Sequence, residues 1–259
     1  MAERLHSGVE SDTMNVDRSA MKAEPNPRPG DDILIRADEG AVVKLTLNRP
    51  QARNSLSLEL IRALHAAFDD CAASPDVKVV VLAASGEAFC AGHDIRELQA
   101  HRTDADAGRA FFERAVTAST AMMQAILACP KPVIAAVQGT ATAAGCQLVA
   151  TCDLAVAADT AAFCTPGVHI GLFCSTPAVA LARNLGRKKA MEMLLLGNTI
   201  DAADACALGL VNKVVPNAEL SAAAQDWAAQ IASKSACALD IGKKAFNQQV
   251  TLPVGDAYE

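Results

Sequence analysis

The sequence lacks the patterns that mark several large classes of protein. No apolar run is long enough to span a membrane, so we expect no membrane partner. No basic stripe is visible and the formal net charge is −6, which disfavours nucleic-acid binding. The motifs G-x-S-x-G, Walker A and G-x-G-x-x-G are absent, so a serine hydrolase or a nucleotide-binding fold has no support.

Paired cysteine motifs are also missing. The nine cysteines are odd in number and scattered, lie mostly inside apolar segments and form no C-x-x-C pair. We therefore predict reduced thiols in the core of a cytoplasmic protein, with no disulfides and no metal site. Hydrophobic residues make up 51% of the chain and charged residues 20%, which is typical of a globular protein with a sizeable core.

Residues 1–30 differ in kind from the rest of the chain. They mix charged residues with Ser and Asn and end in PNPRPG. They contain no apolar stretch of the kind found in a secretory signal, and their acidic residues argue against a transit peptide. We predict a flexible leader.

The remaining sequence alternates between strand and helix patterns, which indicates an α/β protein with helices gathered late in the chain. The expected strands are residues 33–35, 42–47, 77–82, 132–137, 154–157 and 161–164. The expected helices are one capped by Ser57, then 108–129, 143–151, one from near 177, 188–196, 202–208, 220–233 and 238–250.

Two segments follow buried strands and turn through small residues into helical patterns. They are residues 89–95 (FCAGHDI) and 138–147 (QGTATAAGCQ). Small residues let a ligand approach the backbone closely. The start of a helix leaves backbone N–H groups without partners. Two such N–H groups facing one carbonyl oxygen would form an oxyanion hole.

These segments resemble two motifs of the crotonase (enoyl-CoA hydratase/isomerase) superfamily, F-x-A-G-x-D-[ILV] and G-x-x-x-G-G-G-x-[EDQ]. Residues 47–56 (LNRPQARNSL), 151–155 (TCDLA) and 207–211 (ALGLV) extend the resemblance in family order. It covers the chain from about Ile33 to the end. His93 and residues 163–168 (FCTPGV) are most similar to the enoyl-CoA hydratase domain-containing branch, which lacks the catalytic glutamates.

The resemblance implies a crotonase-type spiral of ββα turns over residues 31–196. It also implies a C-terminal helical trimerisation region over residues 197–259, with a further helix or two beyond Glu259. The expected assembly is a homotrimer or a dimer of trimers. The expected small-molecule partner is acyl-CoA, in which coenzyme A belongs to the substrate, so no separate cofactor is expected.

Carried over residue by residue, the resemblance assigns the oxyanion donors to the backbone N–H groups of His93 and Ala144. Ala144 fits this role only if its φ is negative. Arg53 is assigned to the 3′-phosphate of CoA, the alternative being an ordinary surface arginine. Cys174 either reaches the acyl group or packs its loop. The expected substrate contacts are Arg53, Ala91, Asp94, Ile95, Arg96, Gly145, Phe173 and Cys174.

The family's two catalytic glutamates are absent. Their positions hold Gln147 and Gly167. An amide cannot act as a general base, and glycine has no side chain. Hydration by paired carboxylates is therefore not expected. Two functions remain open: an acyl-CoA enzyme with a non-standard proton donor, and a catalytically silent acyl-CoA binder.

His93 is the alternative proton donor, because imidazole titrates near neutral pH. Some decarboxylases of the superfamily carry histidine here and pair it with a tyrosine in a later loop. The only tyrosine in this chain is Tyr258, near its end, so a decarboxylase or a hydrolase using His93 is the weaker alternative to a backbone role alone. His93, Glu97 and His101 would share one face of a continuous helix, where we expect a solvated surface rather than a metal site.

Overall fold

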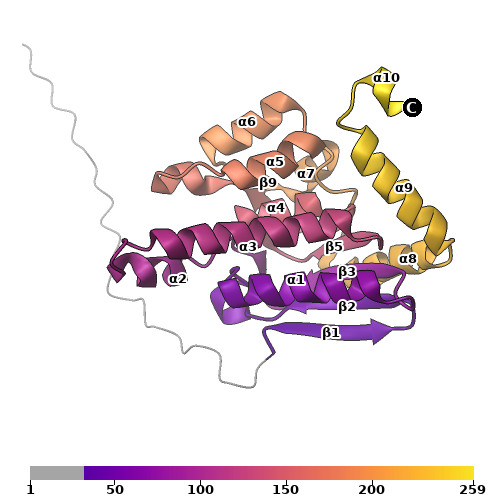
Figure 1. The fold of residues 1–259 in the computed structure, drawn as a ribbon, viewed down its shortest axis with the longest axis horizontal. Helices are drawn as coiled ribbons and strands as arrows, with labels where there is room; N and C mark the ends of the chain where they lie inside the picture. The colour runs from indigo at the N-terminus through magenta and orange to yellow at the C-terminus, as the bar shows by residue number, and fades with distance from the viewer. Residues whose placement is uncertain (1–31) are drawn as a thin grey trace, which may run out of the picture. The chain divides into compact units, whose positions relative to one another are not determined.

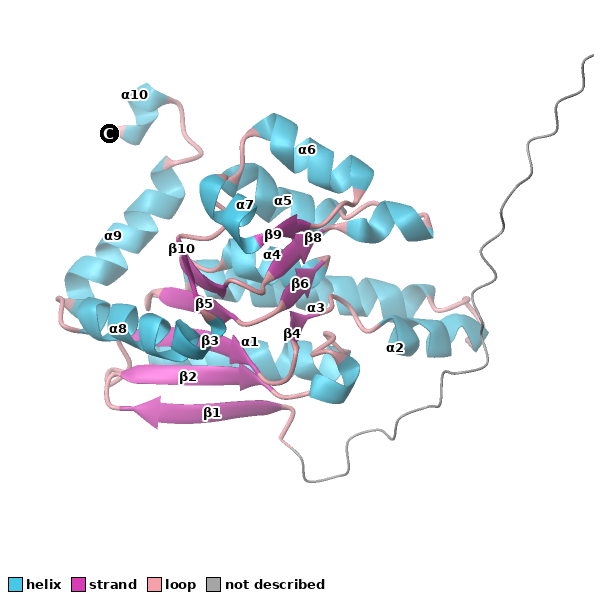
Figure 2. Cartoon of the chain, turned by 180° about the vertical axis from the view of Figure 1, so that it is seen from behind, coloured by secondary structure: helices cyan, strands magenta, loops and turns pink. Residues whose placement is uncertain are grey.

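The structure is a computed structural model, and it describes residues 32–259; the predicted leader lies outside this range. A six-stranded sheet has the order β1-β2-β3-β5-β7-β10 (Figure 2). Its strands are β1 (Leu34–Glu39), β2 (Val42–Leu47), β3 (Val79–Ala84), β5 (Val133–Val137), β7 (Leu154–Ala158) and β10 (Lys213–Val215). β1 pairs antiparallel with β2, and the other neighbours are parallel. The β-branched runs of β3 and β5 suit strands that are covered on both faces.

A second, smaller sheet explains the two segments of small residues. Its order is β4-β6-β8-β9. Its strands are β4 (Ala88–Cys90), β6 (Thr140–Thr142), β8 (Ala162–Cys164) and β9 (Ile200–Asp201). The chain visits the sheets alternately, through β3 and β4, then β5 and β6, then β7 and β8. This alternation confirms the predicted spiral. The sequence pattern does not predict β4 and β6, because each strand has only three residues.

The helices lie close to the predicted ranges. They are α1 (Leu58–Ala73), α2 (Ile95–Ala100), α3 (Arg109–Ala128), α4 (Ala144–Thr151), α5 (Ser175–Asn184), α6 (Arg187–Leu196), α7 (Ala202–Ala207), α8 (Leu220–Ala232), α9 (Ala236–Gln249) and α10 (Val254–Ala257). The Ser57 hydroxyl accepts a hydrogen bond from the Leu60 N–H at 3.2 Å, which confirms the predicted N-cap of α1.

The six-stranded sheet separates two groups of buried side chains. One group joins the sheet to α1, α3 and α4 and contains Leu45, Leu64 and Ile126. The other lies under α8, where Val81 and Ala224 are buried and Trp227 is partly buried against them. Figure 1 shows α1 and α3 running along the spiral. Helices therefore cover both faces of the sheet.

Two side chains of helix α9 bond to the spiral: Asn247 donates to the Leu127 carbonyl oxygen at 3.2 Å, and Lys243 makes several contacts. Lys243 Nζ lies 2.7 Å from Asp153 Oδ2, and it also donates to the carbonyl oxygens of Ile126 and Lys131. Asp153 Oδ2 accepts a second hydrogen bond from the Val133 N–H at 2.7 Å. Burial raises the pKa of Asp153, and Lys243 opposes that rise. The TCDLA segment therefore contributes an aspartate that joins β5 to α9.

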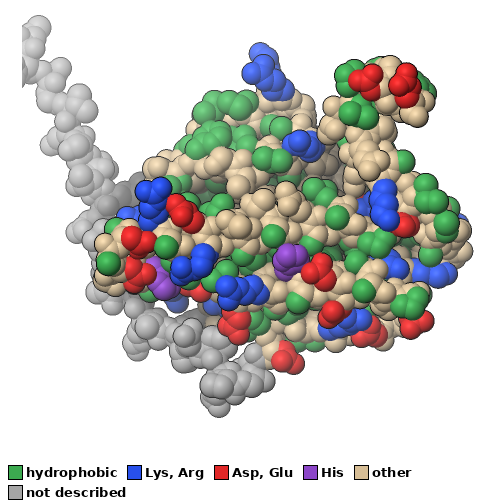
Figure 3. Space-filling view, viewed as in Figure 1, with side chains coloured by type: hydrophobic (Ala, Val, Ile, Leu, Met, Phe, Trp, Pro, Cys, Tyr) green, Lys and Arg blue, Asp and Glu red, His purple; other side chains and the backbone are tan. Residues whose placement is uncertain are grey.

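Helical spacing predicts that Met191, Leu194 and Leu195 of α6 form one exposed apolar face, and the structure differs at one of them. Met191 and Leu195 of α6 are exposed, but Leu194 is only 3% exposed and belongs to the core. Leu196 takes its place on the surface, 52% exposed. Figure 3 shows apolar side chains gathered on the surface around α6. No helix in the described part of the chain is both long and apolar enough to cross a bilayer. The boundary between residues 196 and 197 stays a prediction.

Candidate active site

The first oxyanion segment is held by a single β-bridge between Leu56 and His93. The Leu56 N–H donates to the Gly92 carbonyl at 2.7 Å, and the Asp94 N–H donates to the Leu56 carbonyl at 3.1 Å. In such a bridge the residue between the two bonded neighbours turns its own N–H the other way. The His93 N–H accordingly has no acceptor among residues 32–259.

The second oxyanion segment turns from β6 into α4. The Ala143 N–H donates to the Cys164 carbonyl at 2.9 Å, and the Gln147 N–H donates to the Ala143 carbonyl at 3.0 Å, which starts the helix. Ala144 is the first helical residue, and its N–H finds no acceptor in the described chain. Ala144 is not among the residues with positive φ, as its predicted role requires. The unusual backbone lies one residue earlier, at Ala143, with φ 51° and ψ −118°.

Gly92 brings the two free N–H groups to the same small space. Its φ is 85°, and a Cβ atom added to it would lie 3.3 Å from the Ala144 nitrogen and 3.0 Å from the Thr142 oxygen. The Gly92 carbonyl carbon is bonded to the His93 nitrogen, so both donors border the place that a side chain would fill. Two backbone N–H groups arranged in this way can stabilise a developing oxyanion.

Gly145 packs directly against β4, and its expected ligand contact stays a prediction. A Cβ atom there would overlap the Cys90 carbonyl group. Helix α4 therefore lies directly on the end of β4, and this close approach keeps the two oxyanion segments together.

Asp94 holds the first segment in place. Its Oδ1 accepts from the N–H groups of Arg96 and Glu97, and its Oδ2 accepts from Arg49 Nη2 at 3.0 Å and from Ser55 Oγ at 3.1 Å. Burial raises the pKa of Asp94, but these hydrogen bonds and the Arg49 charge outweigh it, so the pKa lies below its ordinary value.

The Asp94 carboxylate therefore positions the first segment, and its expected contact with substrate stays a prediction. Sequence reasoning missed the part played by Arg49, because its carboxylate partner lies 45 residues further along the chain. Arg49 is only 8% exposed in the folded chain, and this burial shows that it pairs with Asp94 inside the protein.

Arg53 lies on the surface beside this framework. It is exposed with φ 51°, and its carbonyl oxygen accepts from the Ala91 N–H at 3.0 Å. Its guanidinium group has no ion-pair partner in the part of the chain that the structure describes. The Arg53 backbone is therefore joined to the first oxyanion segment by one hydrogen bond, and its side chain is exposed beside it.

The remaining expected contacts lie around the same segments. Ile95 is 43% exposed and Phe173 is 47% exposed, while Arg96 is exposed in the first turn of α2. Phe173 belongs to the short connection between the turn Pro166–Ile170 and α5. Large apolar side chains left in water at these two places are suited to covering an apolar ligand.

The two glutamate positions offer no carboxylate. Gln147 is 7% exposed, and its Oε1 has no hydrogen-bond partner within residues 32–259. Gly167 is buried, and its φ lies outside the left-handed region. A Cβ atom on Gly167 would lie 2.9 Å from Cys174 Sγ. A thiol therefore lies where a side chain at position 167 would begin.

The imidazole of His93 is uncharged at neutral pH. Burial holds the pKa of His93 below its ordinary value of 6.5, and no charged neighbour contributes. A general base is normally oriented by a third group, and among residues 32–259 no side chain bonds to this ring. This arrangement favours a backbone role for His93.

The condition under which His93, Glu97 and His101 would share one helix face is not met. α2 begins only at Ile95, after the Asp94 cap. Glu97 accepts from the Leu58 N–H at 2.9 Å, and His101 Nδ1 lies 2.8 Å from the Asp104 carboxylate. Across residues 32–259 no group of three ligating side chains is arranged to hold a metal ion.

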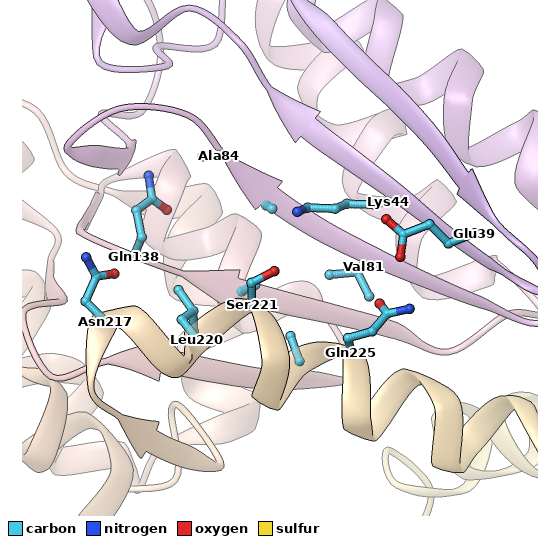
Figure 4. A pocket seen from close by; sticks show the side chains of 12 residues that line it. Glu39, Lys44, Val81, Ala84, Gln138, Asn217, Leu220, Ser221 and Gln225 are labelled. Atoms are coloured by element: carbon cyan, nitrogen blue, oxygen red, sulfur yellow. The ribbon is translucent and has the colours of Figure 1, made fainter.

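A separate cavity of about 250 Å³ lies between the six-stranded sheet and α8 (Figure 4). Lys44 of β2 faces it from the sheet, and Ser221 and Gln225 face it from α8. Gln138 also lines it, and its buried Oε1 has no hydrogen-bond partner among the described residues. Neither His93 nor Ala144 lines this cavity, so it is distinct from the space beside Gly92.

The fold and the two converging segments define a crotonase-type protein. Residues 37–258 match the family described as enoyl-CoA hydratase/isomerase. Human mitochondrial enoyl-CoA hydratase domain-containing protein 3 is 43% identical over 239 residues, which cover 92% of this chain and 76% of the relative. A probable enoyl-CoA hydratase of Mycobacterium bovis is 37% identical, covering 88% of this chain and 86% of its own.

Solved structures agree with the sequence comparison. An enoyl-CoA hydratase from Mycobacterium smegmatis superposes with a TM-score of 0.82 at 48% identity, covering 87% of this chain and 86% of its own. Human enoyl-CoA hydratase domain-containing protein 3 gives a TM-score of 0.82 at 42% identity, covering 87% of both chains. The chain therefore belongs to the enoyl-CoA hydratase/isomerase family.

Proposed function

We propose that the protein binds an acyl-CoA thioester and stabilises negative charge on its thioester oxygen. The supporting observation is the pair of unpartnered N–H groups of His93 and Ala144, which border one small space beside Gly92. When a proton leaves the carbon next to the thioester, the charge moves to this oxygen as an enolate. Removing one such donor typically slows a reaction by about a hundred- to a thousand-fold.

The chemistry is enoyl-CoA hydratase/isomerase-like, without water addition by two carboxylates. Gln147 can orient a ligand by hydrogen bonds but cannot take up a proton, and Gly167 has no side chain. The enzymatic reaction therefore relies on the oxyanion hole and on another proton donor. His93→Ala tests the imidazole as that donor, because the variant keeps the backbone N–H.

A catalytically silent acyl-CoA binder is the second candidate. It is favoured by the absence of a carboxylate at positions 147 and 167 and by the lack of any group that orients the His93 ring. Incubation with a panel of acyl-CoAs, with products identified by mass spectrometry, separates the two. New products that depend on the protein indicate an enzyme, and unchanged substrates with measured binding indicate the silent binder.

Calorimetric titration with acyl-CoAs tests binding itself. Gly92→Ala should abolish binding, because its methyl group would stand 3.3 Å from the Ala144 nitrogen. Gly40→Ala is the matched control: Gly40 also has positive φ, 64°, but nothing lies within 4 Å of its Cβ position. Gly40→Ala should bind as the parent does. Absence of heat and of thermal stabilisation with the folded parent protein would refute the proposal.

We also propose that Arg53 binds the 3′-phosphate of CoA. One charged hydrogen bond of this kind is worth about a tenfold change in affinity. Arg53→Ala should weaken binding of an acyl-CoA about tenfold but leave binding of its 3′-dephospho form unchanged. Arg62→Ala, on the exposed face of α1, is the control. An equal loss of affinity for the acyl-CoA and for its 3′-dephospho form would show that Arg53 does not bind the 3′-phosphate.

For its location we propose the cytoplasm, supported by nine free cysteines, six of them buried. The human relative carries the word mitochondrial in its name. Cell fractionation with an antibody against the protein distinguishes the two compartments, and enrichment with a mitochondrial matrix marker would refute this proposal.

A further inference from the structure

Cys174 occupies the space in front of Gly167. Its sulfur would lie 2.9 Å from a Cβ atom on that glycine. Burial raises the pKa of the Cys174 thiol, and a hydrogen bond from the Gly167 N–H opposes this rise. Cys174 is the residue before α5, and no side chain caps that helix. The sulfur therefore accepts a hydrogen bond from the Gly167 backbone and does not cap α5.

The thiol also lies near the first turn of α4. Helix α4 packs against α5. Cys146 of α4 is close enough to Cys164 and Cys174 for their charges to raise its pKa further after burial has raised it. Cys146 and Cys164 are buried, whereas Cys174 is only partly buried. Of these three thiols, Cys174 is the one that an incoming ligand can reach.

Gln147 is a second, separate observation on helix α4, which packs against α5. It follows Cys146 in the same turn of α4, is 7% exposed, and has an Oε1 without a hydrogen-bond partner in residues 32–259. Buried polar atoms are nearly always paired, so an unpaired one indicates a polar group from outside the chain. The free N–H of Ala144 belongs to the same turn.

We propose that Cys174 adds to the β-carbon of a 2-enoyl-CoA whose thioester oxygen is held by the N–H groups of His93 and Ala144. This inference rests on the proposed function. The thiol loses its proton, its sulfur forms a bond to C3, and the C2=C3 electron pair moves onto the thioester oxygen as an enolate. The enolate collapses as C2 takes up one proton. The net change is addition of S–H across the double bond, with nothing oxidised or reduced and CoA still attached.

The pH dependence of this addition follows from the thiol. The thiolate is the nucleophile, and the raised pKa of Cys174 keeps most of the sulfur protonated at pH 7. Below that pKa the thiolate fraction grows tenfold for each pH unit. Adduct formation should therefore be about tenfold faster at pH 8 than at pH 7.

Intact-protein mass spectrometry of the full chain tests the proposal, with crotonyl-CoA as the reactive ligand and butyryl-CoA as the saturated control. The parent protein should gain the mass of one crotonyl-CoA and nothing from butyryl-CoA. Cys174→Ser should gain no mass. Cys237→Ser removes an exposed thiol on α9 and should form the adduct as the parent does.

Calorimetric titration of the same samples with butyryl-CoA separates the two proposals. Binding of butyryl-CoA without a crotonyl-CoA adduct at pH 8 overturns the assignment of Cys174 and leaves acyl-CoA binding standing. An adduct of equal yield on Cys174→Ser also overturns the assignment. Absence of both binding and adduct refutes the proposed function together with this inference.

Discussion

Gly92 and Ala143 face each other where the two oxyanion segments meet: a Cβ atom added to Gly92 would lie 3.0 Å from the Cβ atom of Ala143. Both residues have positive φ. Glycine adopts such a backbone freely, but in an alanine it costs about 1–3 kcal/mol. Ala143 directly precedes Ala144, so the strained residue is the one that aims the second N–H donor.

Replacing Ala143 by glycine should raise the free energy of unfolding by about 1 kcal/mol, because the relieved strain exceeds the entropy that glycine adds to the unfolded chain. Urea unfolding measures the change. Ala144→Gly is the control, since Ala144 has ordinary helical backbone and the substitution should lower stability by about 0.5–1 kcal/mol. A less stable Ala143→Gly protein would contradict the assignment of strain.

Hydration of crotonyl-CoA by the parent protein should be absent or far below a typical enzyme turnover of about 10 per second. The reason is the lack of a carboxylate at Gln147 and Gly167. The loss of the enoyl thioester absorbance measures the rate. Turnover at the typical rate would show that another group supplies the base, and His93→Ala would then identify or exclude the imidazole.

Restoring both carboxylates should create weak hydratase activity, at most about a few per cent of an efficient enzyme, because the surrounding groups were not arranged for them. Gly167 accepts a side chain without backbone strain, but its Cβ would stand 2.9 Å from Cys174 Sγ and 3.0 Å from the Leu172 oxygen. Adding Cys174→Ala to Gln147→Glu and Gly167→Glu should therefore give more activity than the double variant.

Gln147→Glu alone is the control for this series, and crotonyl-CoA binding is checked in each variant. A folded triple variant that binds crotonyl-CoA but hydrates it no faster than the parent would mean that the oxyanion geometry does not support this reaction. That result would favour the silent binder.

Acid should weaken the protein through Asp94. Its pKa is lower in the folded chain than its ordinary value of 3.8, so its stabilising contribution is complete above about pH 4 and is lost as the pH falls through the folded-state pKa. Asp94→Asn should cost about 3 kcal/mol at pH 7, because the buried Arg49 loses its charged partner. The variant should also lose part of the parent's acid sensitivity.

Urea unfolding of both proteins at neutral and acidic pH measures this difference. Asp38→Asn is the control, since the Arg36–Asp38 pair is exposed and should contribute little. Parallel pH profiles for the parent and Asp94→Asn would contradict the role given to Asp94.

We expect a trimer or a dimer of trimers, with a mass about three or six times the 26.9 kDa of one chain. The motivation is the apolar surface left uncovered on α6, where Leu195 is 55% exposed, and on α9, where Phe246 is 61% exposed. Light scattering measures the mass, and Leu195→Glu should lower it. A monomer at all concentrations would contradict this prediction.

The sequence alone predicted the long helices, the strands β1, β2, β3, β5, β7 and β8, the Ser57 cap and the two segments of small residues, because each depends on neighbouring residues. β-Branched runs, helical spacing and small residues after a strand act over a few positions. The sequence also showed that positions 147 and 167 hold no carboxylate, because the residue type at a position is read directly from the sequence.

Only the tertiary structure showed that the strained backbone is at Ala143 rather than Ala144, that Arg49 is buried against Asp94, and that Cys174 fills the space before Gly167. Each of these depends on segments that meet only in the folded chain, where close packing decides which backbone bends and which polar groups pair. The same holds for Leu194, which the helical pattern placed beside Leu195 and the packing of α6 buried. Local patterns cannot carry such information, because it belongs to contacts between residues far apart in the sequence.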